Sequence, residues 1–355
     1  MTVRLGINGF GRIGRQVARI ASRAEDLAVV AVNTRRPDPA RLAHLLRYDS
    51  VHGPFEGEVR VEDGELWVAG RSVRLTGEED PGRIDWWSRD VDVVVEASGA
   101  FVEGDGARRH LDGGAPRVVI TAPAVDADAT LVVGANEGTF DPERHHVVSA
   151  ASCTTACLAP VVRVLHRAFE VRGGFALTVY AYTRDQELVD GTHDDLRRAR
   201  AAALNIVPTR TGAARILGRV LPDLDGRISA TAVRVPVADV SLLSLSVSVE
   251  ASVPAEEVND AFRDAARGEL APVLGVTEEP LVSSDFVGDP RSAVVDLPMT
   301  RVDRGPGGSQ VQVLAWYDNE FGYASRVVDL IRLVAGAPAA AGDAPAVTAR
   351  AAALG

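Results

Sequence analysis

Apolar runs and helical patterns alternate along the first half of the chain. Residues 3–7 form a continuous apolar run, and a helical pattern follows with apolar residues at Val17, Ile20 and Ala21. Further apolar runs predict buried strands at 28–33, 91–99 and 118–123. Strands that alternate with helices are typical of a parallel sheet with helices on both faces. We therefore expect an α/β fold with a Rossmann-type, doubly wound parallel sheet that binds its ligand at the strand carboxyl ends.

Composition narrows the class of protein without identifying it. The 355 residues include 46% hydrophobic residues and carry a net charge of −11. This length accommodates two domains, and the lack of a long basic run argues against nucleic-acid binding. No apolar run reaches membrane-spanning length and no signal peptide precedes the first strand, so we expect no membrane partner and a cytoplasmic location. Two cysteines four residues apart are a weak metal signal, and no metal site is predicted.

Cys153 is the first candidate for chemistry. Small and hydroxylated residues precede it, and an apolar helical pattern follows at Leu158, Val161, Val162 and Leu165. Cys153 is therefore expected at a helix N-terminus, where free N–H groups and the helix dipole favour a thiolate. Cys157, one turn further on, fits a small buried apolar side chain. The local pattern by itself leaves both a nucleophilic and a structural role open for Cys153.

A glycine-rich turn between the first strand and the first helix predicts a nucleotide site. The turn has the pattern G-x-G-x-x-G and comprises Asn8, Gly9, Phe10, Gly11, Arg12, Ile13 and Gly14. Such glycines let the backbone approach a pyrophosphate held at the helix N-terminus, and the alternative is a purely structural turn. Residues at the ends of later strands are expected to face the same ligand, namely Ser98, Gly99 and Thr121.

The second strand ends without the acidic residue that usually contacts an adenosine ribose. Thr34, Arg35 and Arg36 stand there instead. Without a carboxylate a 2′-phosphate is not repelled, and an arginine can pair with it. The alternative is two solvated arginines in a loop. This position favours NADP and leaves NAD possible.

Several ordered segments carry a resemblance to a known family. They are 8–15, 42–53, 151–160, 177–186, 195–212, 232–236, 280–286 and 316–323. From residue 3 to about residue 335 the chain resembles the phosphorylating glyceraldehyde-3-phosphate dehydrogenases. The resemblance implies a dinucleotide-binding domain at 1–152, completed by a C-terminal helix at 319–336, and an α+β catalytic domain with a mixed or antiparallel sheet at 153–318. The Ala/Gly/Pro-rich tail at 337–355 is expected to be disordered.

The resemblance also implies a mechanism and a set of residues. The Cys153 thiolate attacks a small phosphorylated aldehyde, hydride passes to the nicotinamide, and inorganic phosphate releases the thioester as an acyl phosphate. Asn319 orients the nicotinamide amide. Phosphate groups are bound by Thr183 and Arg234 and by Ser152, Thr154, Thr211 and Gly212. A homotetramer is implied, and Gly191-Thr192, where NAD-preferring members carry Leu-Pro, is a second indication of NADP.

The chain departs from the family near the nucleophile. Tyr180 stands where the family has its catalytic histidine, and Ala156 stands where it usually has Asn. A phenol with a pKa of about 10 is a poor base at neutral pH, and losing a positioned base costs about 10²–10⁴ in rate. Tyr180 can still donate a hydrogen bond to a developing oxyanion. The arginines at positions 184 and 210 are more basic than the residues usual in the family. Either they pair with an extra anionic group, or they are only solvated.

Three readings follow for the function. The first is an NADP- or NAD-dependent oxidation that is slow or respecialised, including hydrolytic oxidation of another phosphorylated aldehyde such as erythrose 4-phosphate. The second is a nucleotide-binding paralogue that has lost turnover, as Tyr180 and Ala156 suggest. The third is an isoform that resists an electrophilic inhibitor because its thiolate is weakened.

Overall fold

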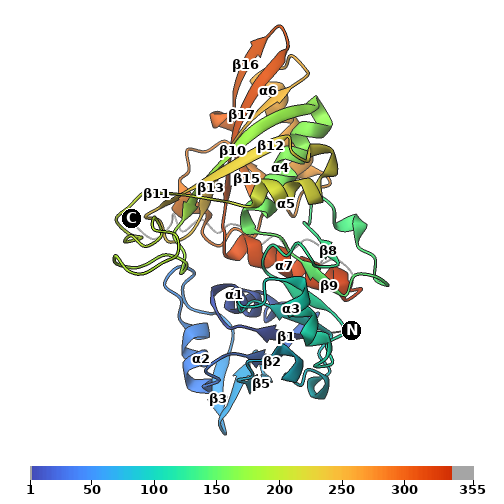
Figure 1. Cartoon of the computed structure of the whole chain (residues 1–355), viewed down its shortest axis with the longest axis vertical. Coiled ribbons are helices and arrows are strands. Elements are labelled where there is room, and N and C mark those ends of the chain that lie inside the picture. The colour runs from blue at the N-terminus through green and yellow to red at the C-terminus, as the bar shows by residue number, and fades with distance from the viewer. Residues whose placement is uncertain (1, 338–355) are drawn as a thin grey trace.

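The structure is a computed structural model that describes residues 2–337. Except for Ala337, the tail predicted at 337–355 lies outside the described residues. Two sheets lie at opposite ends of the long axis, and helix α7 lies between them (Figure 1). The helices are α1 (Arg12–Ala21), α2 (Pro39–Arg47), α3 (Gly104–Arg108), α4 (Cys153–Phe169), α5 (Ala213–Val220), α6 (Ala255–Arg267) and α7 (Phe321–Val334).

The first sheet has nine strands in the order β3-β4-β5-β2-β1-β6-β7-β9-β8. They are β1 (Val3–Asn8), β2 (Leu27–Asn33), β3 (Val59–Glu62), β4 (Glu65–Val68), β5 (Arg71–Thr76), β6 (Val93–Glu96), β7 (Val118–Ile120), β8 (Ala129–Thr130) and β9 (Val147–Ser149). All pairs are parallel except β3/β4 and β4/β5. The strand order reverses at β1, so the crevice for a ligand opens where β1 and β6 end.

Both faces of this sheet are covered, as the continuous apolar runs predict. One face packs against α1, α2 and α7, and the other packs against α3 and Trp86. Within β6, Val93 and Val95 point to the first face and Val94 to the second, as the two-residue period of a strand requires. The parallel α/β fold expected from the sequence is confirmed.

The second sheet has eight strands and mixed pairing. Its order is β11-β12-β10-β13-β17-β15-β14, with β16 paired to β17. The strands are β10 (Val171–Ala181), β11 (Val207–Thr209), β12 (Ile228–Val235), β13 (Ser241–Val249), β14 (Leu274–Thr277), β15 (Ala293–Asp296), β16 (Arg301–Gly305) and β17 (Gly308–Tyr317). β10/β12 and β14/β15 are parallel and the other pairs are antiparallel. The expected second, mixed sheet is therefore confirmed.

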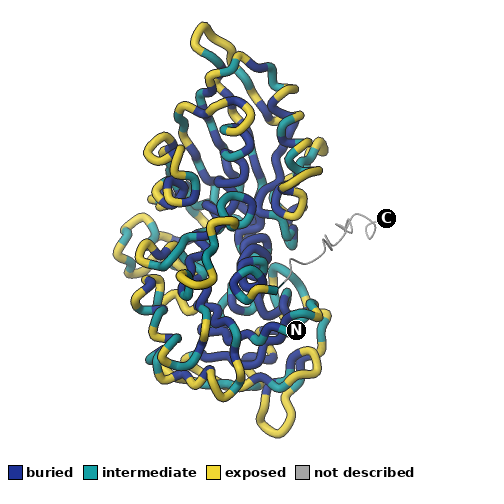
Figure 2. The backbone as a smooth tube through the Cα atoms, turned by 90° about the vertical axis from the view of Figure 1, so that its right-hand side faces the viewer, coloured by how far each residue is buried: buried dark blue, intermediate teal, exposed yellow. Residues whose placement is uncertain are grey.

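Helix α7 returns to the first half of the molecule. Tyr323, Val327 and Ile331 are buried in the same apolar core as α1 and β1. The Arg332 guanidinium also pairs with Asp26 at the end of that core, with an Nε–Oδ2 distance of 2.7 Å. Buried residues, dark blue in Figure 2, extend through both halves of the molecule. These contacts support the assignment of the C-terminal helix to the nucleotide domain, although the helix is shorter than the expected 319–336.

Candidate active site

A strained turn between β9 and α4 presents Cys153. Ala151 has φ of 55°, in the left-handed region that residues with a Cβ seldom adopt. The Tyr323 hydroxyl donates to the Ala151 carbonyl at 3.0 Å and holds this turn. Ser152 is the N-cap residue of α4, and its Oγ accepts from the Thr155 N–H at 3.1 Å. Cys153 is therefore the first residue of α4, as the sequence predicts.

Cys153 lies where the two large cores of the molecule meet. Its half-buried side chain packs against both apolar clusters, one beneath each sheet. Cys157 is fully buried in the second-sheet core, in agreement with its expected structural role. Ala156 is also buried, in the core of the first sheet. The methyl group at position 156 therefore offers no hydrogen bond to the neighbourhood of the thiol.

Tyr180 faces the cysteine directly. Its hydroxyl lies 2.6 Å from Cys153 Sγ. Tyr180 on β10 is paired in register with Arg234 on β12, and the Arg234 guanidinium lies 4.3 Å from the centre of the Tyr180 ring. The Tyr317 ring packs edge-on against Tyr180 at an interplanar angle of 64°. The phenol therefore contacts an aromatic ring and a cation, and its hydroxyl contacts the thiol.

The electrostatics around Cys153 favour the neutral thiol. Burial raises the pKa of Cys153, and the Tyr180 hydroxyl and the Arg234 charge offset this rise only in part. Burial also raises the pKa of Tyr180 well above its ordinary value, so the phenol stays protonated and acts as a donor. The helix position of Cys153 was predicted correctly. The expectation that this position favours a thiolate stays a prediction, and burial of the sulfur acts against it.

No histidine replaces the missing base within residues 2–337, judged by hydrogen bonds to the thiol. The seven histidines include His166, at the far end of α4, and His193, whose Nδ1 accepts from the Asp195 N–H at 2.9 Å. His110 is bonded inside the first domain, at 2.9 Å from Glu96. The acid–base chemistry available beside Cys153 is therefore that of Tyr180.

Residues expected to bind phosphate form two groups. Arg234 Nη1 donates to Thr183 Oγ1 at 2.8 Å, so these two side chains are brought together beside Tyr180. Gly212 is the N-cap of α5 and provides no side-chain cap, so the N–H groups of the first turn beyond Ala213 are available to an anion. The Thr211 hydroxyl lies at the same helix end and accepts from the Ala213 N–H at 3.2 Å. Both groups have the chemistry of a phosphate site.

The remaining hydroxyls of the predicted phosphate set are partly occupied. Ser152 Oγ caps α4, and Thr154 Oγ1 lies 3.2 Å from the buried Tyr317 hydroxyl. The Tyr317 hydroxyl also lies 2.6 Å from Thr178. Sequence reasoning missed Tyr317, although it lies within the recognised segment 316–323.

The glycine-rich turn has the shape that a nucleotide requires. Gly9 has φ of 95°, and a Cβ there would lie 2.4 Å from the Ser98 backbone. A Cβ at Gly14 would lie 2.1 Å from the Gly9 carbonyl oxygen. Gly11 is the N-cap of α1 and provides no side-chain bond to the first turn. The backbone N–H groups at this helix end therefore fit a pyrophosphate.

A buried carboxylate holds the two strand ends that form this crevice. Glu96 accepts from Asn8 Nδ2 at 2.5 Å and from the Ser98 N–H at 2.8 Å. Asn8 Oδ1 in turn accepts from Asn33 at the end of β2. Thr121 Oγ1 donates to the Glu96 carbonyl at 3.0 Å. Sequence reasoning missed Glu96, because an isolated acid at the end of a strand carries no motif.

The other predicted nucleotide residues differ in their surroundings. Phe10 is buried, Ile13 is half-buried and Gly99 is exposed. Thr34 donates its N–H to the Thr76 carbonyl, whereas Arg35 and Arg36 are exposed at the end of β2. Arg12 forms ion pairs with Asp49 and Glu320.

Asn319 is anchored beside the start of α7. It is buried, and its Oδ1 accepts from Ser241 Oγ at 2.7 Å. The bond fixes the carboxamide of Asn319 and leaves its nitrogen free to face a ligand. Arg184 and Arg210 are exposed, and neither forms a hydrogen bond or ion pair with another described residue.

Taken together, the fold and site define a two-domain, nucleotide-dependent dehydrogenase with a cysteine between its domains. Comparison with known proteins identifies the family within this class. Residues 3–104 match the NAD binding domain of glyceraldehyde 3-phosphate dehydrogenase, and residues 152–319 match its C-terminal domain. The chain belongs to the glyceraldehyde-3-phosphate dehydrogenase family and is an NAD(P)-dependent oxidoreductase.

Curated relatives align over nearly the whole chain. Glyceraldehyde-3-phosphate dehydrogenase 2 of Streptomyces arenae is 50% identical over 335 residues, which is 94% of this chain and 99% of the relative. Glyceraldehyde-3-phosphate dehydrogenase 1 of Bacillus subtilis is 48% identical with the same coverage. The family resemblance predicted from the sequence is confirmed. No helix among residues 2–337 is long and apolar enough to span a membrane.

Proposed function

We propose that the chain oxidises a small phosphorylated aldehyde through a covalent bond to Cys153. The observation that carries this proposal is the placement of Cys153 Sγ, Tyr180 and the Arg234–Thr183 pair next to one another. A bound nicotinamide supplies the hydride acceptor, and Gly9, Gly11 and Asn319 have the shape and chemistry to hold it. The Cys153 thioester is then released to inorganic phosphate as an acyl phosphate.

Tyr180 gives this site an altered acid–base chemistry. The protonated phenol donates to the sulfur and, after attack on the aldehyde, to the oxygen that gains negative charge. It does not remove the thiol proton at neutral pH, because burial raises the pKa of both groups. Turnover at neutral pH is therefore slow, or the site serves an aldehyde other than glyceraldehyde 3-phosphate.

NADP is the proposed preference, with NAD as the alternative. Arg35 and Arg36 are exposed at the carboxyl end of β2, next to Thr34. Two guanidinium groups without a carboxylate at this edge suit a 2′-phosphate. The double variant R35A/R36A should lower the NADP-to-NAD ratio of kcat/KM at least about tenfold, as expected when a charge-assisted contact is lost. An unchanged ratio would exclude this role.

A homotetramer is proposed from the family resemblance, and one segment of the chain supports a subunit interface. Within residues 182–206, apolar side chains are exposed at Leu188, Val189, Leu196, Leu204 and Ile206. Contiguous exposed apolar surface marks an interaction site in most proteins. The segment follows Tyr180 directly, so a neighbouring subunit would cover the chain beside the active site. A cytoplasmic location stays a prediction.

Steady-state oxidation of glyceraldehyde 3-phosphate with phosphate tests the proposal. Wild type and Y180H are compared with NAD and with NADP. We expect a low rate for wild type and a gain of about 10²–10⁴ for Y180H, the usual contribution of a positioned base. If wild type is active and Y180H is less active, Tyr180 serves a different chemistry, and the substrate is another aldehyde. Product analysis then separates acyl phosphate from the free acid of a hydrolytic oxidation, as with erythrose 4-phosphate.

The two alternative functions, a non-enzymatic paralogue and an inhibitor-resistant isoform, predict different results in the same assay. A nucleotide-binding paralogue binds NADP, shows no turnover in either form, and is not labelled at Cys153 by an electrophile. An inhibitor-resistant isoform keeps turnover in the presence of an electrophile that stops Y180H. Both readings fail if wild-type turnover is ordinary and equally sensitive.

A further inference from the structure

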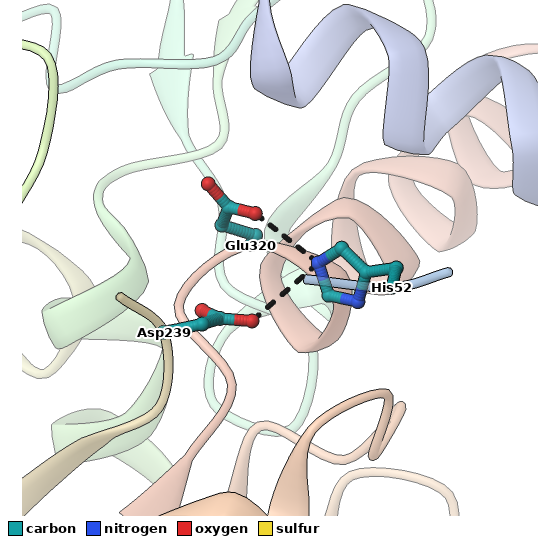
Figure 3. Close-up of side chains that lie close together, drawn as sticks. All are labelled: His52, Asp239 and Glu320. Atoms are coloured by element: carbon teal, nitrogen blue, oxygen red, sulfur yellow. Dashed lines mark hydrogen bonds and ion pairs between the residues drawn. The ribbon is translucent and has the colours of Figure 1, made fainter. Parts of the chain in front are cut away.

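Three side chains from distant parts of the chain meet between the two sheets (Figure 3). His52 follows α2, Asp239 lies between β12 and β13, and Glu320 is the N-cap of α7. His52 Nε2 lies 3.1 Å from Glu320 Oε2 and 3.4 Å from Asp239 Oδ2. The three ligand atoms all lie within 4.8 Å of one another. The proposed redox site uses none of these three side chains.

Asp239 is the unusual member of this cluster. Its side chain is only 1% exposed, yet neither carboxylate oxygen accepts a hydrogen bond from any described residue. A buried carboxylate is strongly destabilising unless a cation or several donors compensate it. His52 Nε2 lies 3.4 Å from Asp239 Oδ2 (Figure 3). The carboxyl group of Asp239 is therefore a buried acceptor that faces the imidazole.

The surrounding charges do not compensate it. Four carboxylates gather here, those of Asp49, Asp239, Asp318 and Glu320. Among the described residues in direct contact, one guanidinium opposes them, that of Arg12, and it is bonded to Asp49 and Glu320. Backbone N–H groups occupy both oxygens of Asp318. Burial and the carboxylates of Asp318 and Glu320 raise the pKa of Asp239 to about 9, so at neutral pH a proton neutralises this group unless a cation replaces it.

We propose that His52, Asp239 and Glu320 bind a divalent transition-metal cation of the zinc, cobalt or manganese class. One imidazole and two carboxylates are ligands that suit such ions. At metal–ligand distances of about 2.1 Å, the two measured separations correspond to ligand–metal–ligand angles of about 95–110°. Arg12 donates to both oxygens of Glu320, from Nε to Oε1 at 2.8 Å and from Nη2 to Oε2, and so fixes that carboxylate, as outer partners do at metal sites. This proposal differs from the sequence-based expectation of no metal site, and the titration below tests both.

Such an ion would link the two domains beside the nicotinamide site. His52 belongs to the nucleotide half, and Asp239 belongs to the catalytic half. Glu320 is adjacent to Asn319, which is held by Ser241 two residues after Asp239. Bound metal would therefore fix the relative position of the loops that orient Asn319. The role is structural or regulatory, since Cys153 is not a ligand.

Cobalt binding to the full-length protein tests the site without relying on activity. Chelator-treated protein carrying C153S and C157S, which removes both thiols, is titrated with Co²⁺ and followed by visible absorption and calorimetry. We expect one ion per chain, visible ligand-field bands and a rise in Tm on binding. D239N and H52Q should each weaken affinity about 100-fold or more, at least the loss seen when outer partners of a metal are removed.

Controls separate the site from adventitious binding and from misfolding. D63N changes an exposed carboxylate on the β3–β4 turn and should bind Co²⁺ like the parent. In chelator, D239N should fold with an unchanged or higher Tm, because it removes a buried carboxyl group that is costly to ionise. H52Q gives an independent result if D239N does not fold. Failure of the parent to bind stoichiometric Co²⁺, or affinities of D239N and H52Q that equal the parent's, would overturn the proposal and leave a proton as the counter-ion of Asp239.

Discussion

Tyr180 changes what Cys153 can do at neutral pH. Its hydroxyl contacts the sulfur, and its own pKa lies well above the ordinary value because it is buried. A neutral phenol stabilises a thiolate by donating one hydrogen bond, whereas an imidazolium would add a full charge. Burial raises the pKa of Cys153, and one donated bond only partly offsets it. With histidine at position 180, the cysteine could form a thiolate–imidazolium ion pair. With Tyr180, it is a thiol that accepts one hydrogen bond from a neutral phenol.

This exchange predicts the pH dependence of thiol reactivity. The thiolate is the nucleophile, and below its pKa the thiolate fraction rises about tenfold per pH unit. Since burial raises the Cys153 pKa, alkylation by iodoacetamide should keep rising through pH 9 without a plateau. The measurement is the alkylation rate of C157S, in which Cys153 is the remaining thiol. Y180H should reach its plateau at lower pH, and Y180F should react more slowly than wild type. A plateau below pH 7 in the C157S protein would refute this account.

Helix termini place both halves of the site. The turn before α4 presents Cys153, and the turn before α1 forms the predicted pyrophosphate site. Each depends on local backbone geometry, namely the left-handed Ala151 and Gly9 and the N-caps that follow them. Substitutions at these turns should therefore alter the stability or position of a whole helix or strand, and not only one contact.

Removal of the Ser152 cap of α4 should lower the stability of the protein. Ser152 Oγ accepts from the Thr155 N–H, and an N-cap serine replaced by alanine typically costs about 1 kcal/mol. S152A should lower the free energy of unfolding by about this amount in urea. S152T and S152N preserve a cap and serve as matched controls. An unchanged midpoint for S152A would mean that the cap does not stabilise α4.

A side chain at Gly9 should abolish the nucleotide site. A Cβ at Gly9 would lie 2.4–2.6 Å from the backbone of Ser98 and Ala97, and its φ of 95° disfavours any side chain. G9A should push β1 and β6 apart and abolish NADP binding measured by fluorescence titration. G11A, where a Cβ meets no atom within 4 Å, is the control and should be better tolerated in folding. Normal nucleotide affinity in G9A would contradict the placement of the pyrophosphate.

At the scale of the whole molecule, one surface stands out. The apolar side chains exposed on residues 182–206 lie on the chain that leaves β10 directly after Tyr180. A free subunit would present this surface to water next to its own active site. Assembly would both bury it and enclose the site.

A charge on this surface should disrupt assembly. Leu204 is 83% exposed in the single chain. L204D should convert a tetramer into smaller species in sedimentation velocity, because a buried unpaired carboxylate is costly in an interface. Trp87 is 77% exposed but lies far from the segment in sequence, so W87S is the control and should keep the parental mass. A monomeric parent would remove the basis for a tetramer.

The sequence by itself determined the elements and their local chemistry. Continuous apolar runs predicted β1, β2, β6 and β7 because strands buried on both faces have no polar side. Glycine spacing predicted the β1–α1 turn, and the helical pattern after Cys153 placed that residue at the start of α4. These features depend on neighbours within a few residues, which a sequence displays directly. The mixed second sheet came only from family resemblance.

The tertiary structure decided which side chains meet and in which charge state. The register of β10 and β12 places Tyr180 beside Arg234, and no local pattern encodes that pairing. Burial raises the Cys153 pKa against the expected helix effect, because desolvation depends on everything packed around the sulfur. His52, Asp239 and Glu320 carry no motif, since they lie up to 268 residues apart in the chain. Their meeting, and the raised pKa of Asp239 that results from it, exist only once the two domains are packed together.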